Sequence, residues 1–244
     1  MEQKIRVGAV SYLNTKPLLY GIHRSPVMEQ IELVLDYPSS IAKQLVDGQI
    51  DVGLVPVAII PFLQQHFIVG DYCIGAVGPV ASVCIFSDVP MEEITTVLLD
   101  YQSRTSVALA QVLLKKFWKK DVVFEAAKPG YQTLINGATA GVVIGDRAFE
   151  QRTKSKYVYD LAEAWIAYTG LPFVFAAWIA NKQLPESFTI PFNAANGVGL
   201  QHLDEVMIGL ESPFYDLETY YTKNINYVLD DDKRKGLERF LKEL

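Results

Sequence analysis

The stretch VGAVSYLNTKPLLYG, residues 7–21, joins a predicted buried strand to a helix through a short polar turn. The apolar run Ile5–Val10 is typical of a buried strand. Pro17 falls where a helix begins, a place where the missing N–H of proline would have no intrahelical partner anyway. A strand that leads into a helix N-terminus directs free N–H groups past its carboxyl end, and such groups bind anions. Ser11 and Asn14 add side-chain donors, so the turn is predicted to bind an anion.

Two further strands follow in the same order. Ile31–Asp36 alternates between apolar and polar residues and predicts a second strand, and the helix after it has Ser39 or Ser40 as its N-cap. Asp51–Val55 predicts a third strand, which Pro56 and a short apolar helix follow at once. Strands that alternate with helices in this way indicate a parallel sheet with helices on both faces.

The β-rich stretch Tyr72–Phe86 interrupts this alternation and carries a Gly78-Pro79 pair at its centre. The alternation then begins again, with strands expected at 96–99, 122–125 and 141–144 and helices expected at 107–118 and after residue 145. A second β-rich stretch, Phe173–Ala180, precedes mainly helical patterns that run to Leu244. At 244 residues the chain is long enough for two lobes of about 100 residues each.

The repeated organisation predicts an α/β clamshell of two lobes, with two mixed, mainly parallel sheets and a helical C-terminal tail. The two β-rich stretches would be the crossings between the lobes. We expect lobe 1 to be discontinuous and to comprise residues 1–82 and 177–244, with lobe 2 formed by residues 83–176. The ligand would bind in the cleft between them.

Four turns are expected to meet across this cleft, because ligands of open α/β sheets bind beyond the carboxyl ends of the strands. They are residues 11–15, 37–40, 100–106 and 145–147. The third turn is the richest in donors, with Ser103, Arg104, Thr105 and Ser106 at a helix N-terminus. Hydroxyl, N–H and guanidinium groups together suit a carboxylate. The alternative is that Ser103 only caps the helix and Arg104 is a surface charge.

Asp146 has two open interpretations. Its carboxylate could cap its own helix and pair with Arg147, or it could project into the cleft as a base. The three histidines, His23, His66 and His202, fall in or beside helical segments away from the four turns. The sequence therefore offers no obvious catalytic base.

Composition and motifs restrict the classes of partner. A formal net charge of −6 argues against nucleic acid and anionic membranes. We expect no metal and no cofactor, since no metal-ligand spacing and no nucleotide or hydrolase motif is present. Cys73 and Cys84 lie in apolar runs and are expected to be buried free thiols, as in a reducing compartment. With no signal peptide visible, the protein is expected to be cytoplasmic.

Val10–Leu18 resembles the opening signature of the chorismate dehydratase family, which acts in the futalosine route to menaquinone. The resemblance continues, in order, through residues 37–40, 51–57, 78–83, 99–106, 144–148 and 169–178. A sister family that forms 1,4-dihydroxy-6-naphthoate shares the fold but not the SYLNTKP opening. The resemblance implies the type II periplasmic-binding-protein fold and a cofactor-free hydro-lyase. The reaction would convert chorismate to 3-[(1-carboxyvinyl)oxy]benzoate.

The resemblance and the turns together assign roles to individual residues. Asn14 and Ser11 are expected to be catalytic. The expected substrate-binding residues are Ser39, Ser40, Pro56, Ser82, Ser103, Arg104, Thr105, Ser106, Gly145 and Asp146. A solute-binding protein that closes on a small acid without chemistry is the main alternative function, and a ligand-sensing domain is a second. The oligomeric state stays open.

Chorismate itself suggests where the missing base comes from. It carries two carboxylates, one of them on the enolpyruvyl ether attached to the ring carbon that loses its proton. We therefore expect substrate-assisted elimination, in which the protein holds that carboxylate against the proton.

Overall fold

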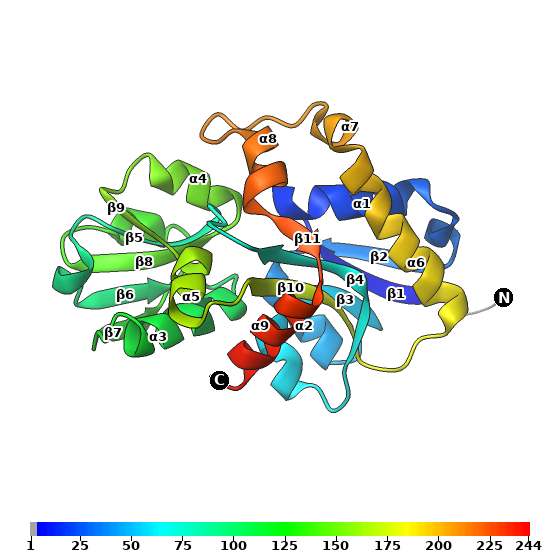
Figure 1. The fold of residues 1–244 in the computed structure, drawn as a ribbon, viewed down its shortest axis with the longest axis horizontal. Coiled ribbons are helices and arrows are strands. Elements are labelled where there is room, and N and C mark those ends of the chain that lie inside the picture. The colour runs from blue at the N-terminus through cyan, green and yellow to red at the C-terminus, as the bar shows by residue number, and fades with distance from the viewer. Residues whose placement is uncertain (1–3) are drawn as a thin grey trace.

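The computed structural model describes residues 4–244, and in it the chain forms two lobes that lie side by side (Figure 1). One sheet has six strands in the order β11-β4-β10-β3-β1-β2, and the other has five in the order β7-β6-β8-β5-β9. Helices pack against both sheets. The predicted two-lobed α/β fold with two mixed sheets is therefore confirmed.

The larger lobe is built from both ends of the chain. Its strands are β1 (Ile5–Val10), β2 (Ile31–Asp36), β3 (Val52–Pro56), β4 (Phe67–Ala76), β10 (Phe173–Ala180) and β11 (Asn226–Val228). Its helices are α1 (Lys16–Arg24), α2 (Pro38–Val46), α6 (Glu186–Val198), α7 (Leu203–Met207), α8 (Leu217–Thr219) and α9 (Asp231–Leu241). Short helices η1 (Leu13–Thr15), η2 (Pro26–Glu29), η3 (Val57–Phe62), η6 (Gly199–Gln201) and the π-helix η7 (Tyr220–Asn224) connect them.

The smaller lobe is formed by the middle of the chain. Its strands are β5 (Val83–Ser87), β6 (Thr96–Leu99), β7 (Val123–Ala126), β8 (Thr139–Ile144) and β9 (Tyr157–Asp160). Its helices are α3 (Thr105–Lys116), α4 (Asp146–Arg152) and α5 (Leu161–Thr169), with short helices η4 (Met91–Glu93) and η5 (Tyr131–Leu134). The strands predicted at 96–99, 122–125 and 141–144 correspond to β6, β7 and β8.

The opening stretch folds as the residue pattern predicts. Val7 and Ala9 of β1 have no exposed surface, and β1 pairs in parallel with both β2 and β3 at the centre of the parallel part of the sheet. Pro17 lies in the first turn of α1. Helix α1 packs closely on α6, since a Cβ added at Gly21 would come within 1.9 Å of the Ala195 carbonyl oxygen.

The crossing strands make both sheets less parallel than the strand–helix alternation predicts. β10 runs antiparallel to β3 and β4, and β5 runs antiparallel to β8 and β9. β5 and β10 are the strands at which the chain passes from one lobe to the other, and each runs opposite to the neighbours it pairs with. β10 belongs to the larger sheet from Phe173 onward, which is earlier than the boundary after residue 176 expected from the sequence.

The C-terminal tail is not only helical. It contains the edge strand β11, which pairs antiparallel with β4, and the π-helix η7. Strand β11 is only three residues long, too short for a period of two to be recognised in the sequence. In Figure 1 the orange segment around α8 lies beside the junction of the two lobes.

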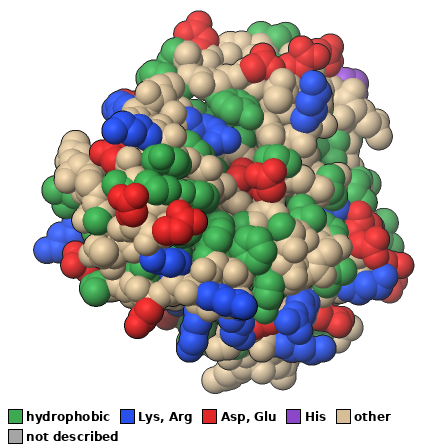
Figure 2. Space-filling view, turned by 60° about the vertical axis from the view of Figure 1, so that its left-hand side comes forward, with side chains coloured by type: hydrophobic (Ala, Val, Ile, Leu, Met, Phe, Trp, Pro, Cys, Tyr) green, Lys and Arg blue, Asp and Glu red, His purple; other side chains and the backbone are tan. Residues whose placement is uncertain are grey.

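The surface and the cysteines agree with the composition. Figure 2 shows acidic and basic side chains interspersed on one face rather than gathered into a single basic patch. Cys73 and Cys84 are buried free thiols, as predicted, and burial raises the pKa of both. Within residues 4–244 no helix is long and apolar enough to cross a membrane.

Asp51 ties β1 to the loop after β10. Its carboxylate accepts hydrogen bonds from the Arg6 backbone N–H at 2.9 Å and from the Arg6 guanidinium at 2.8 Å, and pairs with Lys182 at 2.8 Å. Burial alone would raise the pKa of Asp51, but these donors outweigh it and hold the pKa below its ordinary value. An acid with a lowered folded-state pKa stabilises the fold above its unfolded pKa and loses that contribution as the pH falls.

Asp51→Asn is therefore expected to lower the free energy of unfolding by about 1–2 kcal/mol at pH 7. The difference from the wild type should shrink as the pH falls below about 4, where the unfolded-state carboxyl protonates. Urea denaturation at several pH values measures this. Asp47→Asn, which removes the carboxylate of an exposed pair with Lys43, is the control. A pH-independent difference at Asp51 would contradict the assignment.

Candidate functional site

A cavity lies between the lobes, where the ends of β1 and β3 face α3 and the end of β8. Its volume is about 60 Å³, inside an empty space of about 480 Å³ that includes the open mouth. The cavity has room for only a few waters, since each needs about 10–15 Å³. Six of the predicted site residues line it: Asn14, Pro56, Ser103, Thr105, Ser106 and Gly145. Binding of a larger ligand requires the lobes to part.

The opening turn supplies the larger lobe's side of the cavity. Tyr12, Asn14 and Thr15 all line it. The Asn14 side-chain carbonyl accepts a hydrogen bond of 3.1 Å from the Thr15 hydroxyl. An amide whose oxygen accepts in this way still has two N–H hydrogens to donate.

The N-terminus of α3 supplies the smaller lobe's side. The Ser103 hydroxyl oxygen accepts a hydrogen bond of 3.0 Å from the Ser106 backbone N–H, which caps this helix end. The Thr105 hydroxyl oxygen accepts one of 3.1 Å from Ala58 N–H in the larger lobe, so its hydrogen is free to be donated elsewhere. Hydroxyl hydrogens at a helix N-terminus favour a carboxylate.

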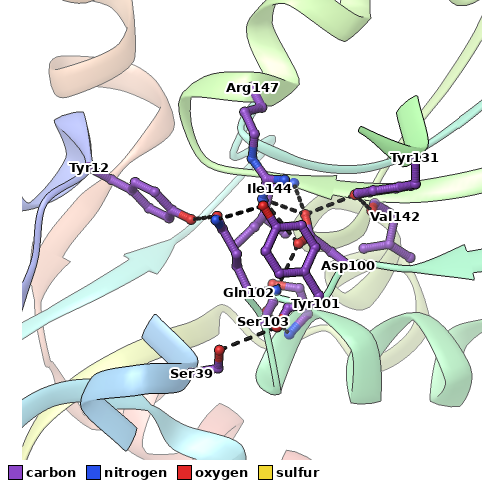
Figure 3. Close-up of polar contacts among 11 residues, drawn as sticks. Tyr12, Ser39, Asp100, Tyr101, Gln102, Ser103, Tyr131, Val142, Ile144 and Arg147 are labelled. Atoms are coloured by element: carbon purple, nitrogen blue, oxygen red, sulfur yellow. Dashed lines mark hydrogen bonds and ion pairs between the residues drawn. The ribbon is translucent and has the colours of Figure 1, made fainter. Parts of the chain in front are cut away.

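Asp100 organises the turn that precedes α3. Its carboxylate has no exposed surface and accepts hydrogen bonds from Gln102 N–H at 2.9 Å, Ile144 N–H at 3.1 Å and the Tyr131 hydroxyl at 2.9 Å. Arg147 pairs with the same carboxylate at 2.8 Å. Figure 3 shows these groups converging on Asp100. One of the two interpretations of Asp146 included a pair with Arg147, and that pairing is wrong because Asp100 takes the guanidinium.

Tyr12 reaches across the cleft to the smaller lobe. Its hydroxyl donates to the Gln102 side-chain carbonyl (Figure 3). Its ring lies against Gly145, where an added Cβ would meet the ring at 2.9 Å and where φ is +64°, in the region that favours glycine. Ser39 adds a second link, since its N–H donates to the Gln102 carbonyl at 3.2 Å and its hydroxyl to the Tyr101 carbonyl at 3.3 Å. These contacts hold the lobes closed.

Asp146 also bonds across the cleft, but to backbone. Its carboxylate oxygens accept from Leu13 N–H at 3.2 and 3.4 Å. Burial raises the pKa of Asp146, and the Leu13 hydrogen bond partly opposes the rise. It is the first residue of α4, whose positive end also favours a carboxylate there. The side chain thus fixes the residue that precedes Asn14.

Six predicted residues lie outside the cavity lining. Ser39 and Asp146 bond across the cleft as described above, and the other four are placed as follows. Ser11 is exposed, because Tyr12 is the residue of that turn that faces the cleft. The Ser40 hydroxyl donates to Asp36 on its own side of the lobe. Arg104 is exposed and borders a separate groove next to Phe62, because the first turn of α3 carries it away from the cleft. Ser82 is buried behind the lining, where its hydroxyl oxygen accepts from Tyr220 at 2.8 Å.

The sequence analysis missed several residues that shape the site. Tyr12 and Gln102 lay within the quoted motifs, yet only their small polar neighbours were considered as donors. Tyr220, Tyr221 and Tyr227 come from the C-terminal tail, far from every motif. The tyrosine-rich run 220–227 was the only signal that could have identified them.

The donors around this cavity are mainly neutral hydroxyl, amide and backbone N–H groups, because Asp100 takes the Arg147 guanidinium. Among residues 4–244 no group of three His, Cys, Asp or Glu side chains is placed to hold a metal ion. The arrangement can bind a small organic acid between the lobes and shield it from water.

The chain matches the family described as menaquinone biosynthesis over residues 5–244. It is 27% identical to the chorismate dehydratase of Thermus thermophilus, over 98% of this chain and 94% of that protein. It is 26% identical to the chorismate dehydratase of Campylobacter jejuni, over 96% of this chain and 95% of that protein.

Solved structures show the same fold at low identity. A protein of Archaeoglobus fulgidus superposes with a TM-score of 0.73 at 14% identity, covering 98% of this chain and 96% of that one. The periplasmic aliphatic sulphonate binding protein SsuA of Escherichia coli superposes with a TM-score of 0.64 at 12% identity, covering 99% and 86%. The fold is that of the periplasmic binding proteins.

Tyr12→Phe removes the hydroxyl that bonds Gln102 and leaves the ring on Gly145. A neutral hydrogen bond contributes about 0.5–1.5 kcal/mol, so the ratio of open to closed molecules should rise by up to about tenfold. Small-angle scattering of the ligand-free protein should then give a larger radius of gyration than that of the wild type. The control is Tyr20→Phe, which removes a hydroxyl that donates to Glu205 away from the cleft. Identical scattering for all three proteins would show that the Tyr12 hydroxyl does not hold the lobes closed.

Proposed function

Because this chain belongs to the menaquinone-biosynthesis family, we propose that it is a chorismate dehydratase, a carbon–oxygen lyase that removes water from chorismate to give 3-[(1-carboxyvinyl)oxy]benzoate. The observation that carries the proposal is the cavity between the lobes, lined by Asn14 from one lobe and by Ser103, Thr105 and Ser106 from the other. These donors match a small ligand with two carboxylates.

The first carboxylate fits the N-terminus of α3. Thr105 and Ser106 are buried, and both line the cavity. Their hydroxyls and the positive N-terminal end of the helix favour a negative charge there. The cleft lies in a protein of net charge −6, so local donors must supply the attraction.

The second carboxylate, on the enolpyruvyl ether, fits the opening turn. Elimination needs an acceptor for the ring proton beside the ether oxygen and a donor for the departing hydroxyl on the adjacent carbon. Since the product gains an aromatic ring, the protein's task is orientation and charge placement. The Asn14 amide would orient the substrate at the reacting carbons.

The base in this proposal is the substrate's own carboxylate. Asp146 is the acid nearest the opening turn, but both of its oxygens accept from Leu13 N–H. It also lies in the first turn of α4, whose positive end favours a carboxylate. Asp100 is enclosed by four donors and has no exposed surface. Asp146 and Asp100 thus have structural partners, which supports substrate assistance.

A binding protein that closes on a small acid without chemistry is the second candidate, favoured by the likeness of fold to SsuA. It would use the same cavity and the same closure. Turnover distinguishes the two functions.

Purified protein incubated with chorismate is expected to yield a product lighter by the mass of one water, with no metal or nucleotide added. Mass spectrometry of the reaction mixture measures this. Prior exhaustive chelation should leave the rate unchanged. Chorismate that binds but is recovered intact would favour the binding protein, and activity lost on chelation and restored by one metal would contradict the cofactor-free reaction.

Asn14→Ala is expected to lower kcat by at least about a hundredfold, since one lost orienting or charge-stabilising contact in a transition state costs about 2.7–4 kcal/mol. Asp146→Asn keeps an oxygen that can accept from Leu13 N–H and should retain kcat within about tenfold. Steady-state kinetics with chorismate, alongside circular dichroism to verify folding, compares the two. A folded, substrate-binding Asp146→Asn protein that is inactive by several orders of magnitude would make Asp146 the base.

A further inference from the structure

Three tyrosines of the C-terminal tail direct their hydroxyls at the two segments that carry Asn14 and Ser82. Tyr221 donates to the Leu13 carbonyl at 2.9 Å, and Tyr227 donates to the Asn14 carbonyl at 2.9 Å. Tyr220 donates to the Ser82 hydroxyl oxygen at 2.8 Å. All three side chains are buried. One short stretch of chain, residues 220–227, therefore contacts both sides of the junction between the lobes.

The backbone before Ser82 is held in a strained conformation. Ser82 N–H donates to the Val80 carbonyl at 2.8 Å, which closes a three-residue γ-turn around Ala81. Ala81 has φ +63°, a region that non-glycine residues rarely adopt and that persists only where the surroundings impose it. The Asp160 carboxylate imposes it here, since it accepts from Val80 N–H at 3.1 Å and from Ala81 N–H at 2.8 Å.

With the backbone fixed in this way, the rotation of the Ser82 hydroxyl is set by Tyr220. A phenol is a stronger donor than an alcohol, so Tyr220 donates and the serine oxygen accepts. Ser82 lies between Ala81 and Val83, a residue of the cavity wall, and its carbonyl accepts from Gly145 N–H of the same wall at 2.8 Å.

We propose that Tyr220 is a positioning residue for the dehydration, which holds Ser82 and, through it, the part of the cavity wall formed by Val83 and Gly145. The inference rests on the proposed function. Burial raises the pKa of Tyr220, so the hydroxyl keeps its proton at neutral pH. The π-helix η7 places Tyr220 for this contact, as π-helical turns often do at functional sites.

The same segment is tied to the crossing by a further contact. The Asn224 side-chain amide donates to the Pro79 carbonyl at 2.8 Å, one residue before the γ-turn begins. Closure of the lobes and the position of Ser82 are thus linked through residues 220–227.

A double-mutant cycle with chorismate tests the proposal. Tyr220→Phe should lower kcat/KM about tenfold, mainly through kcat, with a melting temperature close to that of the wild type. In a Ser82→Ala background the same substitution should cost less than about twofold, because its target is gone. Tyr20→Phe, which removes an exposed hydroxyl remote from the cavity, should stay within about twofold of the wild type.

Ser82→Thr gives a second arm that does not alter Tyr220. It keeps the accepting oxygen and should retain kcat/KM within about threefold, whereas Ser82→Ala should lose about tenfold. An equal cost of Tyr220→Phe in both backgrounds, or equal losses for Ser82→Thr and Ser82→Ala, would overturn the inference. Absence of turnover in the wild type would instead contradict the proposed function. The wild-type protein alone decides that question, and the variants decide the role of Tyr220.

Discussion

The buried carboxylate of Asp100 is the interaction on which the rest of the site depends. It accepts from Gln102 and Ile144 N–H groups and from Tyr131, and it pairs with Arg147. A charge without exposed surface is tolerated only when it is surrounded by donors in this way. Because these donors come from the turn before α3, from β8, η5 and α4, one side chain sets their relative positions.

The consequences reach across the cleft. Gln102, fixed by Asp100, presents its side chain to Tyr12 and its carbonyl to Ser39 N–H. Asp146, next to Arg147 in α4, holds the turn that carries Asn14 through Leu13. The charged groups of this region therefore position the neutral donors that line the cavity. In this account the protein's carboxylates and its guanidinium organise the site, and the substrate brings the charge that reacts.

The sequence predicted the fold because the features that determine it are local. Runs such as Ile5–Val10 and the proline at position 17 identify a strand and a helix start without knowledge of their partners. Five of the cavity residues were predicted because turns after strands meet at one edge of a sheet, and the sixth, Pro56, was predicted from the family resemblance. Ser11 and Arg104 do not line the cavity, because the direction of a side chain within a turn depends on the backbone conformation that the turn adopts.

Other parts of the site could not be predicted from residue patterns. Asp100 looked like an ordinary turn residue, and only its burial reveals its role. Tyr220 and Tyr227 both lie more than two hundred residues after Asn14 in the sequence. Hydroxyl contacts over such separations leave no periodic signal. The missed strand β11 delivers one of them, Tyr227, to the opening turn.

A crystal structure of the protein with its product, 3-[(1-carboxyvinyl)oxy]benzoate, tests the central claim most directly. The account predicts the ligand between the two lobes, with one carboxylate within hydrogen-bond distance of Thr105 and Ser106. The enolpyruvyl carboxylate should lie beside Asn14, and Asp146 should still accept from Leu13 N–H. A ligand bound outside the cavity, or an Asp146 carboxylate turned away from Leu13 onto the ring carbon, would contradict it.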